Sequence, residues 1–220
     1  SLKQTRFNYV SAISGEVLGY NGEPIKEEIF DGGYNDLSGN DNERAIKLMA
    51  HMGYLDENSQ SFKPDEVLLK KDLVKWLGNA FSDNSNYIPR GSGYYLKTDD
   101  VKFYDYSPEQ EGYNAIVRAV RIGVISKDEK ILQPEKRMTI LDMSKLVING
   151  LGLKHMAERP GLFVMDPSIP EGLQKDSGTI ALAKAYGFMN PYEQNYNRKL
   201  TRGEAVQIIY DLLVYLREIL

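Results

Sequence analysis

Residues 34–220 contain one pattern three times, and this repetition constrains the fold more than any other feature of the sequence. In each copy an aspartate precedes an apolar segment that ends at a glycine, and a second apolar segment follows. The anchors are Asp36, Asp105 and Asp166; Gly53, Gly123 and Gly187; and Leu69, Thr139 and Thr201. Successive anchors are 69 and 61, 70 and 64, and 70 and 62 residues apart. Such spacing predicts three equivalent structural units.

Each unit is predicted to be a helix–loop–helix. Apolar residues at spacings of one, three and four, such as Ala45, Ile46 and Met49, indicate the first helix of a unit. The phased glycines follow these segments, at the place where a residue with positive φ commonly ends a helix. The second helices are predicted at 69–81, 139–151 and 201–220. A single helix pair cannot bury its apolar face, so the three units should pack on one another.

Two of the second helices carry a sequence signature of helix capping. Thr139 and Thr201 are predicted N-cap residues, and Asp142 and Glu204 follow three residues later. In this arrangement the threonine hydroxyl accepts from one backbone N–H and the acid accepts from another, which is a capping box. The second helix of the first unit has Leu69 at this position and lacks the signature.

The first 33 residues are predicted to be separate from the repeat. Two short alternating segments around Ser14-Gly15 indicate a β-hairpin. The sequence ISGEVLGYNGEPI resembles the segment that closes PepSY-like and YcdB/YcdC-type repeats of secreted Gram-positive proteins; an ordinary hairpin or linker is the alternative. The expected divisions are a hairpin and linker from an upstream domain at 1–33, and units at 34–101, 102–160 and 161–220.

The repeat resembles the S-layer homology (SLH) domain of bacterial surface proteins. That unit opens F-x-D-V, has Trp-Ala before its first helix, and continues with Gly-Ile, F-x-P and a second helix beginning I-T-R-A-E. Here YNDL at 34–37 and FYDY at 103–106 match the opening, FKP at 62–64 matches the loop, and LTRGEA at 200–205 matches the second helix. The resemblance covers about residues 34–220. It implies a mainly α protein with three helix–loop–helix units in a pseudo-threefold bundle, here with a short N-terminal β-hairpin.

The resemblance also implies that grooves between neighbouring units bind acidic secondary cell-wall polysaccharide. Only the third unit keeps the Thr-Arg pair, as Thr201-Arg202; Lys70 and Ile140 replace the arginine in the other two. Lysine retains the charge without the planar guanidinium that binds a carboxylate through two parallel hydrogen bonds, and isoleucine offers neither. No unit keeps the family tryptophan, so fewer than three working grooves are expected.

The predicted ligand-binding residues are those that could contact an acidic sugar. They are Arg202, Thr201, Asp166, Asp105, Asp36 and Lys70. A glycan carboxylate favours a guanidinium beside backbone N–H groups at a helix N-terminus, and Arg202 is expected to offer both. The three aspartates could accept from sugar hydroxyls, or could only order or cap the entry to a helix. Arg202 could equally be a solvated side chain of a first helical turn, Lys70 is more often a surface lysine, and Trp76 is expected in the core.

Composition excludes several classes of function. The 220 residues include no cysteine, which excludes disulfides, thiolate nucleophiles and cysteine-based zinc sites. A net charge of −4 argues against nucleic acid as a partner, and no apolar run is long enough to span a membrane. His51 and His155 are the only histidines, and HExxH, G-x-S-x-G and P-loop motifs are absent. We therefore expect no catalytic residue, no metal site and no cofactor.

Together these features predict a non-catalytic cell-wall attachment module that anchors a longer protein at the extracellular surface of a Gram-positive-type envelope. Its expected partners are the wall polysaccharide and the upstream domain of the same protein. The alternative is a degenerate SLH-like domain that serves protein–protein or intramolecular docking and binds no glycan. The intact Thr201-Arg202 pair favours the first hypothesis, and the replacements at Lys70 and Ile140 favour the second. A glycan-processing enzyme is the least favoured class, because no motif supports it.

Overall fold

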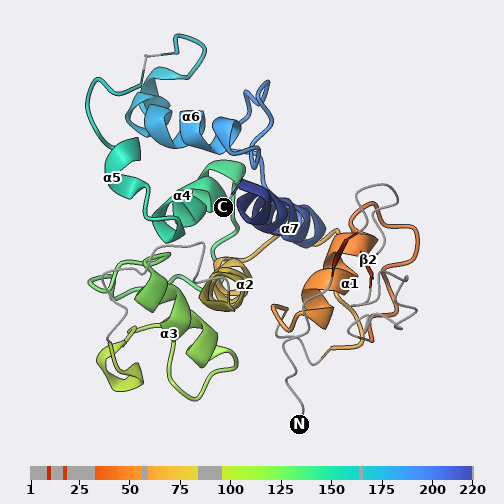
Figure 1. The fold of residues 1–220 in the computed structure, drawn as a ribbon. Coiled ribbons are helices and arrows are strands. Elements are labelled where there is room, and N and C mark those ends of the chain that lie inside the picture. The colour runs from red at the N-terminus through yellow and green to blue at the C-terminus, as the bar shows by residue number, and fades with distance from the viewer. Residues whose placement is uncertain are drawn as a thin grey trace.

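The computed structural model describes residues 33–55, 59–83, 96–163 and 166–219, together with two short strands. The described chain is mainly helical (Figure 1), so the predicted mainly α class is confirmed. The strands β1 (Tyr9–Val10) and β2 (Val17–Leu18) pair antiparallel, with Tyr9 opposite Leu18 and Val10 opposite Val17. The hairpin turn predicted at Ser14-Gly15 lies outside the described residues.

Seven α-helices and two short 3-10 helices lie in the described residues. They are α1 (Glu43–His51), α2 (Lys70–Asp83), η1 (Thr98–Asp100), α3 (Tyr113–Ile122), α4 (Ile140–Gly150), α5 (Lys154–Ala157), η2 (Glu171–Asp176), α6 (Ser177–Ala185) and α7 (Arg202–Ile219). The second helices predicted from the repeat correspond to α2, α4 and α7, with small differences at their ends. The predicted first helices correspond to α1, α3 and α6.

The ends of these helices follow the local sequence signals. Thr139 and Asp142 exchange two hydrogen bonds at the start of α4, the Asp142 N–H donating to Oγ1 at 3.0 Å and the Thr139 N–H donating to the carboxylate at 3.2 Å. Thr201 and Glu204 make the same exchange at the start of α7, at 3.2 and 2.8 Å. Both predicted capping boxes are therefore confirmed.

The three phased glycines end the outer helices as predicted. Gly53, Gly123 and Gly187 have φ angles of +73°, +97° and +79°, and they follow α1, α3 and α6. Glycine adopts this left-handed conformation without the steric cost that a Cβ atom would add. The repeated glycine therefore marks the point at which each outer helix turns into the loop that follows.

Helices α2, α4 and α7 lie near the middle of the molecule, and α1, α3 and α6 lie around them on three sides (Figure 1). Helix α3 packs on α2, α6 packs on α4, and α1 packs on α7. Helices α3 and α6 thus each lie against the central helix that precedes them in the sequence. No α-helix precedes α1 in the part of the chain that the structure describes, and α1 lies instead against α7.

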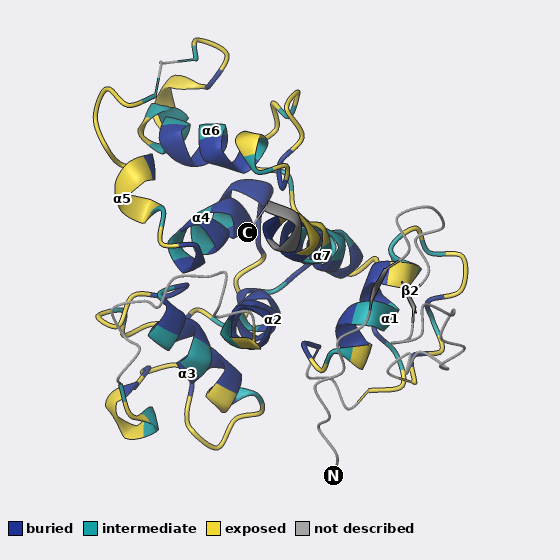
Figure 2. Cartoon of the chain, in the orientation of Figure 1, coloured by how far each residue is buried: buried dark blue, intermediate teal, exposed yellow. Residues whose placement is uncertain are grey.

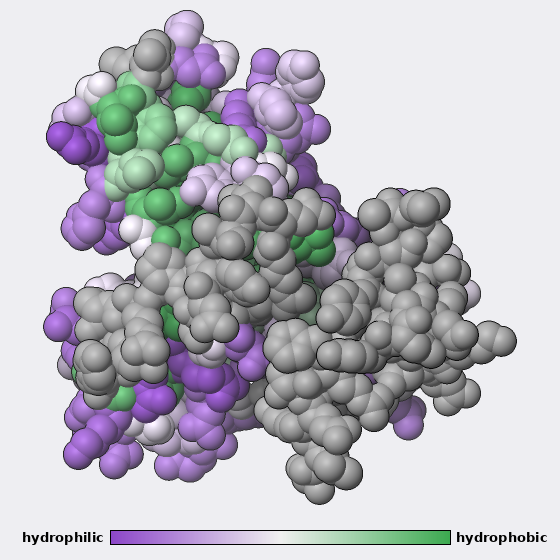
Figure 3. Space-filling model, in the orientation of Figure 1, coloured by the Kyte–Doolittle hydropathy of each residue, from purple (hydrophilic) through white to green (hydrophobic). Residues whose placement is uncertain are grey.

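A single connected core joins these helices. Its buried residues run from Tyr34 to Leu216, and the inward faces of the central helices are buried along most of their length (Figure 2). Trp76 of α2 is 0% exposed, as the sequence predicted. Some apolar side chains remain on the surface near α5 and α6 (Figure 3), among them Met156 and Leu162.

Three backbone hydrogen bonds form a closed ring among the segments that precede the central helices. The Leu68 N–H donates to Leu200 O (2.9 Å), the Leu200 N–H to Met138 O (3.2 Å), and the Met138 N–H to Leu68 O (2.9 Å). Each segment therefore supplies one donor and one acceptor. The ring brings together three places that are far apart in the sequence.

Candidate binding site at the helix N-termini

The first turns of α2, α4 and α7 rest on loops of other repeats. The first N–H group of each helix donates to a loop carbonyl: Lys70 to Lys136 (2.8 Å), Ile140 to Arg198 (3.0 Å) and Arg202 to Glu66 (2.9 Å). We call these contacts the α2 junction, the α4 junction and the α7 junction. They satisfy N–H groups that an isolated helix would leave unpaired. At the α7 junction the Gly203 N–H also donates to Pro64 O at 2.8 Å, so these groups bind a loop of the protein where a glycan carboxylate was expected.

Arg202 lies in the interior of the α7 junction. Its side chain is 10% exposed, which rules out the interpretation as a solvated first-turn residue. The Nη1 atom donates to Oδ2 of Asp72 at 2.6 Å, and Nε donates to the Phe62 carbonyl at 2.9 Å. The guanidinium carbon also lies 4.7 Å from the centre of the Phe62 ring and 5.1 Å from that of Trp76. Arg202 therefore joins α7 to α2 and to the loop of the first repeat.

Asp72 is the main acidic partner in this interior cluster. Its side chain is 8% exposed, and Oδ1 lies 3.6 Å from Nζ of Lys75, whose side chain is also largely buried. One carboxylate thus faces two cations. Near them, Nε1 of Trp76 is one of two buried polar side-chain atoms, among those described, that have no hydrogen-bond partner. We call Arg202, Asp72, Lys75, Phe62 and Trp76 the Arg202 cluster.

Sequence reasoning did not predict a role for Asp72. It occupies the place in α2 that Asp142 and Glu204 occupy in α4 and α7, where the acid completes a capping box. Helix α2 has Leu69 where the other two helices have a threonine, so Asp72 has no hydroxyl with which to form the box. The sequence did contain a signal of this: Asp72 has no threonine three residues before it. An acid in this position that cannot form a capping box is expected to have another partner.

Asp36 shapes the loop on which α7 rests. Its carboxylate accepts from the Ser61 hydroxyl at 2.6 Å and from the backbone N–H groups of Phe62 and Lys63 at 2.9 and 2.7 Å. Partial burial would raise the pKa of Asp36, but these hydrogen bonds outweigh it and hold the pKa below its ordinary value. Lys63 has a φ of +60°, which is uncommon for a residue with a side chain. Asp36 thus stabilises an unusual loop conformation.

Asp105 performs the same role at the α2 junction. It accepts from the N–H groups of Leu132 and Gln133, both at 2.7 Å, and Gln133 has a φ of +57°. Asp166 differs, because its carboxylate accepts from the Ser168 N–H at 2.8 Å, within its own turn. Hydrogen bonds with Ser168 lower the pKa of Asp166. The structure therefore shows an ordering role for two of the three aspartates and a local turn for the third.

The remaining predicted residues are also engaged by the protein. The Lys70 Nζ lies 2.9 Å from Oε1 of Glu129 at the α2 junction, and the Lys70 side chain is 10% exposed. The Thr201 hydroxyl serves the capping box of α7. The structure thus brings Arg202, Thr201 and Asp36 to the α7 junction, and Lys70 and Asp105 to the α2 junction. Asp166 joins neither of these two groups.

Comparison with known proteins gives no assignment: no protein-family model matches this chain, and no curated protein matches it. In the described part of the chain, no group of three histidine, aspartate or glutamate residues could hold a metal ion. A search of the same residues for a helix both long and apolar enough to cross a membrane found none. The SLH resemblance therefore remains a prediction from the sequence.

Proposed function

We propose that this chain is a triplet of SLH-like units that attaches a longer surface protein to acidic secondary cell-wall polysaccharide. The ring of hydrogen bonds among Leu68, Met138 and Leu200 supports this proposal most directly. These residues are 70 and 62 residues apart, which is the spacing of the third set of sequence anchors. A ring of equivalent positions is the expected result when three related units close on one another. In this proposal the module is non-catalytic and extracellular, and its partners are the wall glycan and the upstream domain.

The Arg202 cluster, which holds two cations beside one carboxylate, favours the α7 junction as the main anion-binding groove. Arg202 and Lys75 face the single carboxylate of Asp72 in a largely buried setting. These three groups carry a net charge of +1. A buried charge interacts more strongly with a ligand than an exposed one, because water screens it less. A glycan carboxylate that reached this cluster would offset the excess positive charge.

The other two junctions have less to offer an anion. At the α2 junction the ion pair of Lys70 with Glu129 is neutral. At the α4 junction Arg198 lies 3.4 Å from a carboxylate oxygen of Glu193 and 2.6 Å from one of Glu204, so these three groups carry a net charge of −1. The proposed order of glycan affinity is therefore α7, then α2, then α4.

The docking alternative is supported by a specific observation of its own. Arg202 and Lys70 are both ion-paired with carboxylates of the protein, and both side chains are 10% exposed. Cations held in this way stabilise contacts between repeats without any ligand. A chain of this kind could keep its fold and serve only to dock another domain.

Sedimentation with purified Gram-positive cell walls, before and after chemical removal of the secondary polysaccharide, distinguishes the two functions. We expect the chain to bind intact walls and to lose binding when the polysaccharide is removed. A chain that binds no walls, or binds equally after removal, would contradict the glycan proposal and favour docking.

A double variant tests the role of the guanidinium separately. Arg202→Met with Asp72→Leu removes both charges of the ion pair, so no carboxylate is left buried beside a missing partner. Binding should fall by about tenfold or more, the equivalent of one charge-assisted hydrogen bond. Ile140→Ala, at the corresponding place in α4, is the matched control and should leave binding unchanged. Equal binding by both folded variants would exclude Arg202 from the groove.

A further inference from the structure

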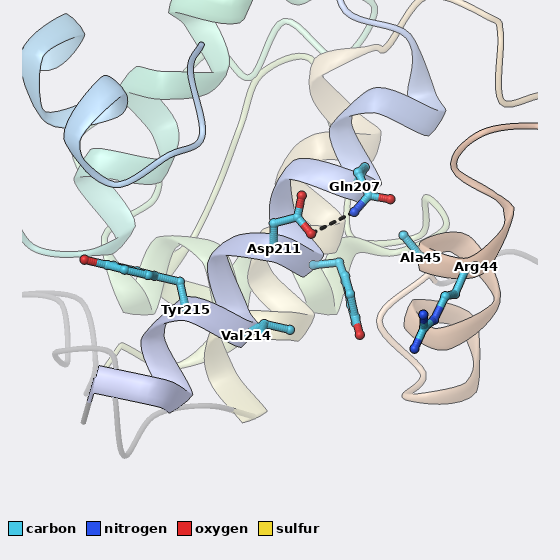
Figure 4. Close-up of a pocket in the computed structure, with 7 residues that line it drawn as sticks. Arg44, Ala45, Gln207, Asp211, Val214 and Tyr215 are labelled. Atoms are coloured by element: carbon cyan, nitrogen blue, oxygen red, sulfur yellow. Dashed lines mark hydrogen bonds between the residues drawn. The ribbon is translucent and has the colours of Figure 1, made fainter. Parts of the chain in front are cut away.

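A hollow of about 420 Å³ lies between α1 and α7, away from the three junctions (Figure 4). It is lined by Arg44, Ala45, Gln207, Tyr210, Asp211, Val214 and Tyr215. The α7 residues are spaced by three and four, so they occupy one side of that helix. In Figure 4, Arg44 and Ala45 face them from α1, whereas Tyr215 points away from α1. The hollow is therefore a feature of the contact between α1 and α7.

A difference between two equivalent positions explains why the hollow occurs here. Gly78 and Tyr210 each lie eight residues after the first residue of α2 and α7. A Cβ atom on Gly78 would lie 2.1 Å from the Ala115 carbonyl, so α2 and α3 touch at this point. Ala45 is the α1 residue that corresponds to Ala115, 70 residues earlier. A tyrosine facing Ala45 does not permit the same approach, and a space remains beside its ring.

The lining combines apolar surface with polar groups from both α1 and α7. Tyr210 is half-buried and Val214 adds exposed aliphatic carbon, whereas Ala45 is buried beneath them. The Gln207 amide donates to Oδ1 of Asp211 at 2.7 Å, which orients that carboxylate. Exposed Arg44 stands across from it on α1. Arg44 and Asp211 have opposite charges, so the hollow favours a neutral ligand over an acidic one.

A sugar ring has the matching chemistry, because one face presents C–H groups and the rim presents hydroxyls. An aromatic side chain such as Tyr210 combines an apolar ring with a polar end. An acetamido substituent matches the remaining groups: its methyl suits Val214, its carbonyl accepts from an arginine, and its N–H donates to a carboxylate. We propose that the α1–α7 hollow binds a neutral N-acetylated amino sugar.

This inference stands apart from the proposed function of the α7 junction. Tyr210 lies about 12 Å along α7 from Arg202, at 1.5 Å per residue. It would remain valid if Arg202 bound no glycan. If both sites operate, the module holds a wall polymer at an acidic group and at a neutral ring.

Titration of the ¹⁵N-labelled full chain with the β-1,4 dimer of N-acetylglucosamine, followed by amide chemical shifts, tests the proposal. We expect saturable shifts in α1 and in the part of α7 from Gln207 to Tyr215, with a Kd on the order of 1 mM. The β-1,4 dimer of glucose, which lacks the acetamido group, should bind several-fold more weakly. Absence of shifts in this region, or equal binding of the two dimers, would overturn the proposal.

Variants locate the binding groups. Tyr210→Ala should weaken binding of the N-acetylglucosamine dimer about tenfold. Asp211→Asn, at an exposed position, should weaken binding of the dimer several-fold without unfolding the chain. If Tyr210→Ala does not fold, the Asp211→Asn variant alone tests whether the hollow binds the dimer. The control Tyr104→Ala removes an exposed tyrosine outside the hollow and should leave binding unchanged. The Arg202→Met, Asp72→Leu variant should also bind the dimer normally. Unchanged binding by Asp211→Asn would refute the assigned role of that carboxylate.

Discussion

Replacing Arg202 with alanine should lower the free energy of unfolding by about 3 kcal/mol, at the lower end of the 3–5 kcal/mol expected when a buried ion pair loses one partner. The change removes the 2.6 Å hydrogen bond to Asp72 and the 2.9 Å hydrogen bond to the Phe62 carbonyl. It also leaves the Asp72 carboxylate, 8% exposed, with Lys75 at 3.6 Å as its remaining cation in the Arg202 cluster. Because Lys75 offsets part of the lost attraction, the expected cost is not at the upper end of the range.

A double-mutant cycle separates the pair from its surroundings. The single variants Arg202→Met and Asp72→Leu each leave a charge without its main partner, whereas the double variant leaves neither. The double variant should therefore be more stable than the sum of the single effects predicts, with a coupling energy of about 2 kcal/mol. Lys75 loses its acidic partner in the double variant, so full recovery to the stability of the original chain is not expected.

Urea unfolding can be followed by two signals in the same samples. Far-ultraviolet circular dichroism reports on the helices, and the fluorescence of Trp76, the only tryptophan, reports on the Arg202 cluster. The two transitions should coincide if the helices and the cluster unfold together. A loss of less than about 1 kcal/mol for Arg202→Ala, or strictly additive single variants, would refute a stabilising role for the pair.

Two further sets of variants test the loops and the helix packing. Asp36→Ala should lower the free energy of unfolding by about 1–2 kcal/mol at pH 7. Asp105→Ala should lower it less, and Asp166→Ala least. The reason is that the three carboxylates accept from three, two and one groups, respectively, of the loop or turn beside them. The pKa of Asp36 is lowered in the folded state, so its stabilisation is complete well above the ordinary value of 3.8 and is lost as the pH falls through the folded value. The difference between the urea midpoints of the original chain and Asp36→Asn should therefore shrink as the pH falls below 3.8, and a constant difference would contradict this. Gly78→Ala should lower the free energy of unfolding by about 1–3 kcal/mol, because its Cβ would meet a backbone carbonyl of α3. The control Gly172→Ala, whose Cβ would have nothing within 4 Å, should leave the melting temperature nearly unchanged. Similar melting temperatures for the two variants would refute the close packing of α2 and α3.

The features that sequence reasoning predicted correctly depend on residues close together in the chain. Thr139 and Asp142 are three residues apart, so their capping box could be predicted without a fold. The left-handed glycines follow apolar segments directly, and Trp76 lies on the apolar side of its own helix. In each case the physical cause acts within one or two helical turns.

The partner of Arg202 could not be predicted in this way. Asp72 precedes it by 130 residues, and the two meet only because the first and third repeats close on one another. The sequence indicated a helix N-terminus that offered its N–H groups to a ligand, whereas loop carbonyls of another repeat accept from them. Asp36 and Asp105 were predicted to bind a ligand, or else to order or cap the entry to the helix that follows them. They accept instead from backbone N–H groups of a loop 26 to 28 residues later, which local sequence could not indicate.

The contact between α1 and α7 has a consequence for the order in which the chain can fold. Helix α1 is made well before α7, yet each covers apolar surface of the other. During synthesis, the growing chain can pair α2 with α3 and α4 with α6 while α1 still lacks its partner. Contacts between distant parts of a chain form slowly, and exposed apolar surface favours aggregation in the meantime. The apolar side of α1 is therefore the surface on which a nascent chain most needs protection, until α7 has left the ribosome.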